Sequence, residues 1–233
     1  MAERWPIPLP SFELDGARTA LLVVDMQDAQ CRSDRGLGKL VAETPGAAEY
    51  FFGGIEDVID SQARLLEDFR AAGRPVVFLT IGPHAHDGSD LPAWKRRRNE
   101  EISQRTGVKY AGRGDPDHAI VAELGPREHE VVLNKSTFGG FAGTGLDLVL
   151  RNWGVEQLVV CGQATNVCVY LTAAEAADRG YECVMVGDAC AAWSERLHDA
   201  FLENFRLLFG RTAESGEVIA ELAVGAGGKD GAP

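Results

Sequence analysis

The sequence alternates short apolar runs with longer segments of helical periodicity, and this alternation constrains the fold more than any other feature. The apolar runs are nearly continuous, as is expected of parallel strands covered on both faces. They are Ala20–Asp25, Pro75–Thr80, Glu130–Leu133, Gln157–Cys161 and Tyr181–Val186. Strands that alternate with helices form βαβ units with right-handed crossovers. We therefore predict an α/β fold, a single-domain Rossmann-like α/β/α sandwich with a mainly parallel central sheet.

Helices are expected between and after these runs. The segment Ile55–Ala72 carries apolar residues on one side and ends at Gly73-Arg74-Pro75, a helix stop. Ser194 is a candidate N-cap for a helix that continues to Phe209. Further helices are expected at Gly145–Trp153, Val167–Arg179 and Gly216–Leu222. The polar stretch Gly82–Pro126 fits the alternation poorly, and we expect an excursion that covers the site or makes a subunit contact.

The 233 residues suit one domain, which we place at residues 18–224 between an N-terminal extension (1–17) and a flexible Gly-rich tail (225–233). The formal charge of -12 argues against nucleic acid and anionic membranes as partners. No stretch approaches the ~20 apolar residues that a membrane span needs. The first ten residues lack the long apolar run of a signal peptide. We therefore expect a cytoplasmic protein.

The chain has five cysteines, an odd number, and no CxxC pair. This pattern supports neither a disulfide framework nor a cysteine-rich zinc site. Cys161 and Cys183 lie in apolar runs and are interpreted as packing residues. Cys168 differs, because it lies in Gly162–Val169, where a strand-like run gives way to a helix. The positive end of a helix dipole favours a thiolate, and free amides there can stabilise an oxyanion. A buried packing role for Cys168 is equally compatible with this segment.

Two ionisable residues follow other apolar runs. Asp25 ends the run Leu21–Val24, where partial desolvation raises a carboxyl pKa and makes a better base. Lys135 follows Val131–Leu133 and precedes a Gly-rich loop. The alternatives are a structural aspartate at a strand end and a surface lysine. Because ligands in parallel sheets bind at the carboxyl ends of the strands, we expect Asp25, Lys135 and Cys168 to face the same edge.

Other catalytic or metal-binding motifs are weak. His84 and His86, with Asp87 and Asp90, form an HxH pattern on a polar segment, which is interpreted as solvated histidines. No GxSxG elbow or P-loop is present in the sequence. We therefore predict no metal and no cofactor.

Together these segments resemble the isochorismatase-like cysteine hydrolases, a family that includes nicotinamidases and hydrolases of biuret, ureidoacrylate and N-carbamoylsarcosine. The resemblance extends over roughly Arg18 to Leu222. The matching pieces are LLVVDMQ (Leu21–Gln27), Lys135 with Phe141 and Thr144–Asp147, GQATNVCV (Gly162–Val169) followed by Thr172 and Ala176, and GDAC (Gly187–Cys190).

The resemblance implies that Cys168 is the nucleophile, Asp25 the general base and Lys135 the cation that holds the carboxylate. It also implies a cis bond between Gln163 and Ala164, and an oxyanion hole formed by the backbone amides of Ala164 and Cys168. The implied reaction is two-step acyl transfer, in which the thiolate attacks an amide or ureido carbonyl and water releases the acyl group from a thioester.

The resemblance further implies a small linear amide or ureido (N-carbamoyl) substrate, with water as the second reactant. Family members commonly carry an aromatic residue where this chain has Gln30. Because that aromatic residue is missing, the resemblance implies a small polar substrate more than an aromatic one. The segment Asp90–Asn99 resembles the inserted loop of biuret and ureido hydrolases. The pocket candidates, whose aromatic members are equally compatible with packing, are Gln30, Trp94, Phe138, Phe141, Asn166 and Tyr170.

Three alternatives stay open: an isochorismatase-type vinyl ether hydrolase, a nicotinamidase, and a catalytically silent scaffold that binds a small ligand. Family members that hydrolyse vinyl ethers generally lack the cysteine, so the presence of Cys168 favours an amidohydrolase. Because family members are usually oligomers, the resemblance also implies a homo-oligomer, either a dimer or a tetramer.

Overall fold

The computed structural model describes residues 5–227, and their strands form one parallel sheet of six strands in the order β3-β2-β1-β4-β5-β6. The strands are β1 (Thr19–Val24), β2 (Val76–Ile81), β3 (Val131–Lys135), β4 (Gln157–Gln163), β5 (Glu182–Ala191) and β6 (Arg211–Ala213). The first five begin within one residue of the predicted runs. The predicted α/β fold is confirmed. The short edge strand β6 was not predicted, because three residues give no apolar run.

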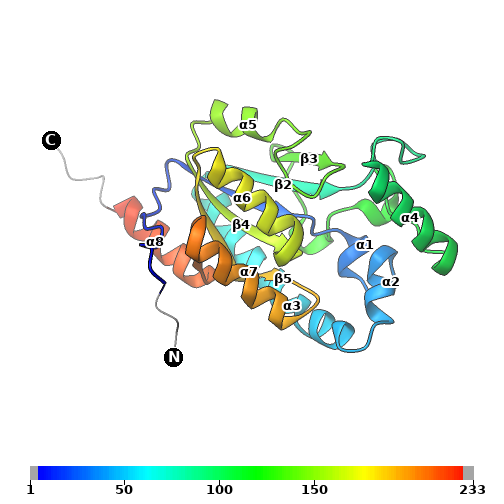
Figure 1. Ribbon diagram of the computed structural model, residues 1–233. Helices are drawn as coiled ribbons and strands as arrows, with labels where there is room; N and C mark the ends of the chain where they lie inside the picture. Colours follow the sequence, from blue (N-terminus) through cyan, green and yellow to red (C-terminus); the bar gives the residue numbers. More distant parts are fainter. Residues whose placement is uncertain (1–4, 228–233) are drawn as a thin grey trace.

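Helices cover both faces of the sheet, which explains why β1 and β2 are buried along their whole length. The helices α3 (Ala47–Ala71) and α8 (Ser215–Gly227) pack against each other and against β5. Because right-handed crossovers change face where the strand order reverses, the opposite face carries α5 (Leu146–Asn152), α6 (Tyr170–Asp178) and α7 (Glu195–Leu208). Figure 1 shows α6 and α7 side by side over the sheet.

The predicted helices are present, with altered ends. The helix α3 begins at Ala47, eight residues before the expected Ile55. Phe51 is buried, and this packing outweighs the cost of about 1 kcal/mol that Gly53 and Gly54 each impose on a helix. Ser194 caps α7 as predicted, because its hydroxyl accepts a hydrogen bond from the amide of Leu197. The expected helix at Gly216–Leu222 extends to Gly227, so part of the predicted tail is helical, while residues 228–233 lie outside the described residues.

The excursion after β2 is largely ordered into short elements. It contains α4 (Ala93–Thr106) and the 3₁₀ turns η1 (Pro116–His118) and η2 (Ala122–Leu124). Two short helices that follow β1, α1 (Asp28–Cys31) and α2 (Gly36–Ala42), were not predicted. Figure 1 shows α1, α2 and α4 together at one end of the molecule, beyond the carboxyl end of β2. This group is therefore placed to cover the edge where ligands bind in parallel sheets.

The strand order reverses between β1 and β4, which are neighbours in the sheet. Crevices in parallel α/β sheets form at this position, outside the carboxyl ends of the strands. The segments that carry Asp25 and Cys168 both begin there. Over residues 5–227, none of the helices is sufficiently long and apolar to cross a membrane.

Candidate active site

The centre of the site is a buried ion pair. Lys135 at the end of β3 places its Nζ 2.7 Å from Oδ2 of Asp25, which directly follows β1. Both side chains are almost completely buried, at 0% and 2% exposure. Because β2 lies between β1 and β3, the two backbones are separated by about 10 Å, twice the strand spacing. The long lysine side chain bridges this distance, and Nζ also donates to the Thr137 carbonyl at 3.3 Å.

The backbone around Asp25 is unusual. Among the described residues, Asp25 is the one non-glycine residue with a positive φ, at 54°. The amide of Asp25 donates to the carbonyl of Leu79, and the Gln163 side chain donates to the backbone carbonyl of Asp25. These contacts from β2 and β4 fix the turn that directs the carboxylate toward the carboxyl edge of the sheet. The same Gln163 side chain donates to Oε1 of Gln30 at 3.0 Å.

Glycine is required where β4 passes β1. Gly162 has φ of 125°, and a Cβ atom there would lie 2.1 Å from the carbonyl oxygen of Val24. The chain then enters Gln163 and Ala164, which are joined by a cis peptide bond. The close approach of the two strands brings the segment after β4 next to Asp25.

Cys168 lies in this following segment, in a short π-helix, η3 (Thr165–Val169), that continues into α6. Single π-helical turns within α-helices are frequent at functional sites. The Cys168 residue is 6% exposed. Asp25 and Cys168 lie close enough for each to affect the pKa of the other. The structure therefore brings the three predicted residues Asp25, Lys135 and Cys168 together.

Burial is the largest single influence on the pKa of each of the three groups. It raises the pKa of Asp25, and the positive charge of Lys135 opposes this rise without cancelling it. Burial also raises the pKa of the Cys168 thiol, and Asp25 raises it further. For Lys135, burial lowers the pKa, but the charges of Asp25 and Cys168 outweigh burial and raise it. The resting site therefore contains a lysine cation, an aspartate with raised basicity and a protonated thiol beside it.

A cavity of about 170 Å³ opens beside these groups. It is smaller than the ~300–1,000 Å³ typical of sites for drug-sized ligands, and thus suits a small molecule. Lys135 is covered and does not line it. The lining residues are Asp25, Gln30, Leu37, Ile81, Arg98, Tyr110, Phe138, Gln163, Ala164, Val167, Cys168 and Trp193.

Of the six predicted pocket residues, only Gln30 and Phe138 line this cavity. The other four lie elsewhere, and their predicted contacts with substrate stay predictions. Trp94 is 48% exposed and contacts the outer side of Phe138, with ring centroids 5.8 Å apart. Phe141 is buried against Tyr181 and below the guanidinium of Arg179.

The remaining two predicted pocket residues are directed elsewhere as well. Tyr170 packs edge-on against Phe201 and receives a hydrogen bond from Asn204 on its hydroxyl, so its ring belongs to the contact between α6 and α7. Asn166 lies next to the cavity-lining Val167, but its own side chain is not part of the cavity wall. Its Oδ1 is buried, with no hydrogen-bond partner among the described residues.

Sequence reasoning missed several residues of the cavity wall. Trp193 follows β5, so the rule of carboxyl strand ends gives a signal for it. Arg98 and Tyr110 belong to the excursion that was expected to cover the site, but its polar pattern does not indicate which side chains turn inward. Leu37 lies on the unpredicted helix α2. Sequence reasoning also missed Lys95, which does not line the cavity but is 1% exposed despite lying in a strongly charged segment.

The two candidate histidines are not gathered into a metal cluster. The Asn134 side chain contacts His84 Nε2 at 3.2 Å, and Asp90 accepts from the backbone amides of His84 and Ala85. No group of three His, Cys, Asp or Glu side chains able to hold a metal occurs within residues 5–227. His86 instead lines a second cavity.

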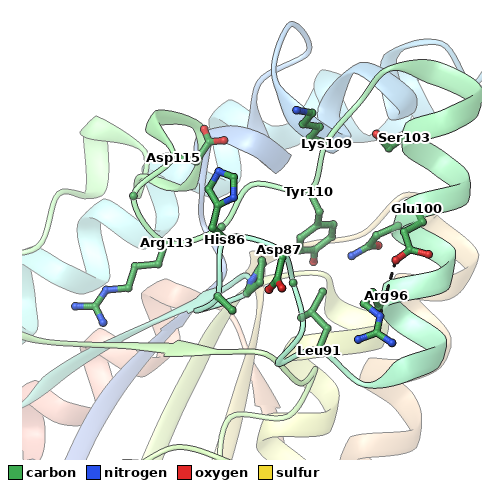
Figure 2. A pocket seen from close by; sticks show the side chains of 16 residues that line it. His86, Asp87, Leu91, Arg96, Glu100, Ser103, Lys109, Tyr110, Arg113 and Asp115 are labelled. Atoms are coloured by element: carbon green, nitrogen blue, oxygen red, sulfur yellow. Dashed lines mark ion pairs between the residues drawn. The ribbon is translucent and has the colours of Figure 1, made fainter.

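This second cavity, of about 540 Å³, lies between the segment that follows β2, the helix α4 and the segment 109–115. Figure 2 shows its charged wall, which includes the ion-paired Arg96 and Glu100 of α4 as well as Arg113 and Asp115. Tyr110 lines both this cavity and the one beside Cys168. None of Asp25, Lys135 and Cys168 lines the second cavity, so the chemistry of the site is confined to the smaller one.

Comparisons with known proteins identify the family to which the chain belongs. The family model described as "Isochorismatase domain" matches residues 19–217. The chain is 33% identical over 223 residues to the ureidoacrylate amidohydrolase RutB of Methylobacterium radiotolerans, covering 91% of this chain and 82% of the relative. It is 29% identical to the uncharacterised isochorismatase family protein YwoC of Bacillus subtilis, covering 88% of this chain and 93% of that protein.

Solved structures give the same result. A cysteine hydrolase from Pseudomonas syringae pv. phaseolicola matches with a TM-score of 0.80 and 28% identity, covering 94% of this chain and 99% of the other. An N-carbamoylsarcosine amidase from Thermoplasma acidophilum matches with a TM-score of 0.61 and 27% identity, covering 85% of this chain and 96% of the other. The family model extends over most of the sheet and includes the segments of Asp25, Lys135 and Cys168. The chain belongs to the isochorismatase family.

Proposed function

We propose that this protein is a cysteine-dependent amidohydrolase that cleaves a C–N bond of a small linear amide or ureido (N-carbamoyl) compound. The observation that carries the proposal is the buried contact of 2.7 Å between Lys135 Nζ and Asp25 Oδ2. Cys168 affects the pKa of the same carboxylate, and both residues line a small cavity. Relatives about a third identical over most of the chain are named as ureidoacrylate amidohydrolases, which supports a hydrolase of carbon–nitrogen bonds other than peptide bonds.

The first half of the proposed reaction forms a thioester. The Asp25 carboxylate accepts the thiol proton of Cys168, and Sγ bonds to the carbonyl carbon of the substrate. The backbone amides of Ala164 and Cys168 stabilise the resulting oxyanion. The C–N bond then breaks, and the leaving nitrogen takes the proton from Asp25.

The second half releases the acyl group. Asp25 accepts a proton from water, whose oxygen attacks the thioester carbonyl, and the C–S bond breaks with return of the proton to Sγ. Throughout both halves Lys135 holds the carboxylate of Asp25 in place, and its positive charge offsets the cost of burying the negative charge. Water is the second substrate, and Asp25, Lys135 and Cys168 return to their initial states at the end of the cycle.

The cavity supports a small polar substrate. Its charged and amide side chains are Asp25, Gln30, Arg98 and Gln163, while the remaining lining residues are mostly aliphatic or aromatic. A substrate with amide or ureido groups matches this division, because its planar nitrogen and oxygen atoms can pair with the polar side chains. Gln30 is held by Gln163, which fixes its position for such a contact.

The test is the Cys168→Ala variant with a substrate panel of linear amides, biuret, ureidoacrylate, N-carbamoyl amino acids and nicotinamide, assayed for released ammonia. We expect the native protein to release ammonia from at least one compound and the variant to lose this activity with its fold intact. Cys183→Ala is the matched control, because Cys183 is a buried cysteine of β5 outside the cavity. Full release of ammonia by Cys168→Ala would contradict the cysteine mechanism, whereas turnover of a vinyl ether such as isochorismate, with no release of ammonia from the panel, would favour a vinyl ether hydrolase. Activity confined to nicotinamide would favour a nicotinamidase, and no turnover of any compound would favour a ligand-binding scaffold.

A further inference from the structure

Helix α4 contributes a second buried cation to the neighbourhood of the site. Lys95 is the buried side chain of this otherwise exposed or half-exposed helix. Its Nζ donates to the carbonyl of Ser136 at 3.0 Å. The ammonium group also lies over two aromatic rings, 4.8 Å from the centroid of Phe138 and 5.3 Å from that of Tyr110. Both rings line the cavity beside Cys168.

Lys95 has no carboxylate partner of its own among residues 5–227, where the ion pairs include Lys135 with Asp25 but none with Lys95. A carbonyl oxygen and two ring faces stabilise an ammonium group only partly, and a buried cation is costly unless an anion compensates it. The anions within its electrostatic reach are Asp25 and the thiolate form of Cys168. Asp25 is already paired with Lys135.

The net charge of the four buried groups depends on whether the Cys168 thiol is protonated. With the thiol protonated, Asp25 balances Lys135, and the positive charge of Lys95 is uncompensated. When Cys168 also loses its proton while Asp25 stays ionised, two anions face two cations and the buried group becomes neutral. Without Lys95 the same loss would leave one buried negative charge in excess, which is unfavourable in a low dielectric.

We propose that Lys95 is a positioning residue of the active site, a second buried cation through which helix α4 favours the thiolate of Cys168. The proposal rests on the proposed function for its catalytic meaning, but its effect is on the thiol itself and is measurable without a substrate. Lys95 does not touch the reacting atoms. It acts through the charge balance of Cys168 and Asp25.

The other charged and titratable groups near Lys95 are consistent with this role. The Lys95 charge lowers the pKa of both Asp25 and Cys168. Burial, reinforced by the charge of Lys135, lowers the pKa of Lys95 itself to about 8, while Cys168 and Asp25 oppose this effect and Arg98 of α4 adds to it. Burial raises the pKa of Tyr110, so its hydroxyl supplies no competing anion.

The test compares the rate at which iodoacetamide, an uncharged reagent, alkylates Cys168 over a range of pH. Mass spectrometry of the peptide that contains Cys168 gives the rate for this residue alone. In Lys95→Met, which keeps most of the length of the side chain and removes the charge, we expect alkylation about tenfold slower at pH 7, equivalent to a rise of one unit in the thiol pKa. Lys95→Arg retains a charge and should restore most of the rate.

Lys109→Met is the matched control, because it removes the same charge from an exposed position in the segment that bears Tyr110. Figure 2 shows Lys109 and Tyr110 pointing to different sides of the chain. We expect Lys109→Met to leave the alkylation profile unchanged. Native-like alkylation in Lys95→Met would overturn the proposal. Equal slowing in Lys95→Met and Lys95→Arg would also overturn it, because the role of Lys95 would then be one of shape.

This experiment separates the two proposals. If Cys168→Ala retains full turnover, the cysteine mechanism fails whatever the alkylation rates are. If Cys168→Ala is inactive and Lys95→Met is alkylated like the native protein, the mechanism stands and the role of Lys95 falls. Thermal melting shows whether each Lys95 variant is folded. If Lys95→Met is unfolded, the comparison of Lys95→Arg with the native protein still tests whether charge at this position sustains the rate.

Discussion

At the scale of single residues, Asp25 connects the most parts of the site. It lies at a positive φ, pairs with Lys135, affects the pKa of Cys168, and is held through its backbone by β2 and β4. Its pKa is raised because burial disfavours the carboxylate, despite the neighbouring lysine. A buried ion pair of this kind contributes little net stability, but losing one partner is costly because the other charge stays buried.

Removing the cation of this pair tests that cost. We expect Lys135→Met to abolish hydrolysis and to lower the free energy of unfolding by about 3 kcal/mol or more at neutral pH, because the carboxylate is left unpaired. Urea denaturation gives the free energy. The double variant Asp25→Asn/Lys135→Met removes both charges and should be more stable than Lys135→Met alone. A double variant less stable than the single one would contradict a buried ion pair.

The raised pKa of Asp25 has a consequence for the pH dependence of activity. A general base works only when deprotonated, so kcat/KM should begin to fall on the acid side at a higher pH than an unperturbed aspartate would give. Because the folded state binds this proton more tightly than the unfolded chain, the protonation of Asp25 does not itself unfold the protein. The acid loss of activity should therefore be reversible while circular dichroism stays native.

The control for this profile is Asp28→Asn, since Asp28 is a nearby aspartate that pairs with Arg32 and Arg35 outside the cavity. This variant should keep the acid limb of the native protein. An acid limb that coincides with loss of native circular dichroism would show that unfolding, and not the protonation of Asp25, limits activity.

At the scale of elements, the junctions after β1 and β4 determine the site. Gly162 allows the backbone of β4 to approach β1, and η3 then presents Cys168 beside Asp25. The excursion is fastened to the sheet by Gln27, whose side chain pairs with Ile81 of β2 and with the carbonyl of His118. The walls of the cavity thus come from elements that are far apart in the sequence.

We expect Gly162→Ala to lower the free energy of unfolding by at least ~2 kcal/mol, because its φ is 125° and the new Cβ would overlap the Val24 carbonyl. Urea denaturation measures the change. Gly53→Ala is the control, because Gly53 is exposed within α3 and a Cβ there meets no atom within 4 Å. That variant should stabilise the protein by ~0.5–1 kcal/mol. Equal effects of the two substitutions would show that close packing at Gly162 is unimportant.

At the scale of the whole molecule, the parallel sheet supplies a rigid platform and the α1, α2 and α4 group covers its active edge. The fold and the family are established, while the substrate, the catalytic roles and the assembly are proposals. A homo-oligomer, dimer or tetramer, stays a prediction that sedimentation velocity can test. Exposed apolar side chains occur on α5, α6 and the edge strand β3, at Leu148, Leu171 and Val132, and would suit such contacts.

The sequence by itself determined five of the six strands and the strand ends from which the three central residues follow. Continuous apolar runs are a local signal, and each is long enough to specify a strand without knowledge of its neighbours. The rule of carboxyl strand ends then placed Asp25, Lys135 and Cys168 on one edge. The family resemblance added their proposed roles.

Only the tertiary structure decided which side chains form the cavity. Trp94, Lys95 and Arg98 share one helix whose sequence has no apolar periodicity, yet Trp94 is exposed, Lys95 is buried and Arg98 lines the cavity. Their environments depend on how α4 and Tyr110 dock against the loop after β3. The periodicity of a segment indicates only which face of that helix or strand is apolar. A cavity wall depends on the packing of several elements that are distant in the sequence, so the pattern within one segment does not predict it.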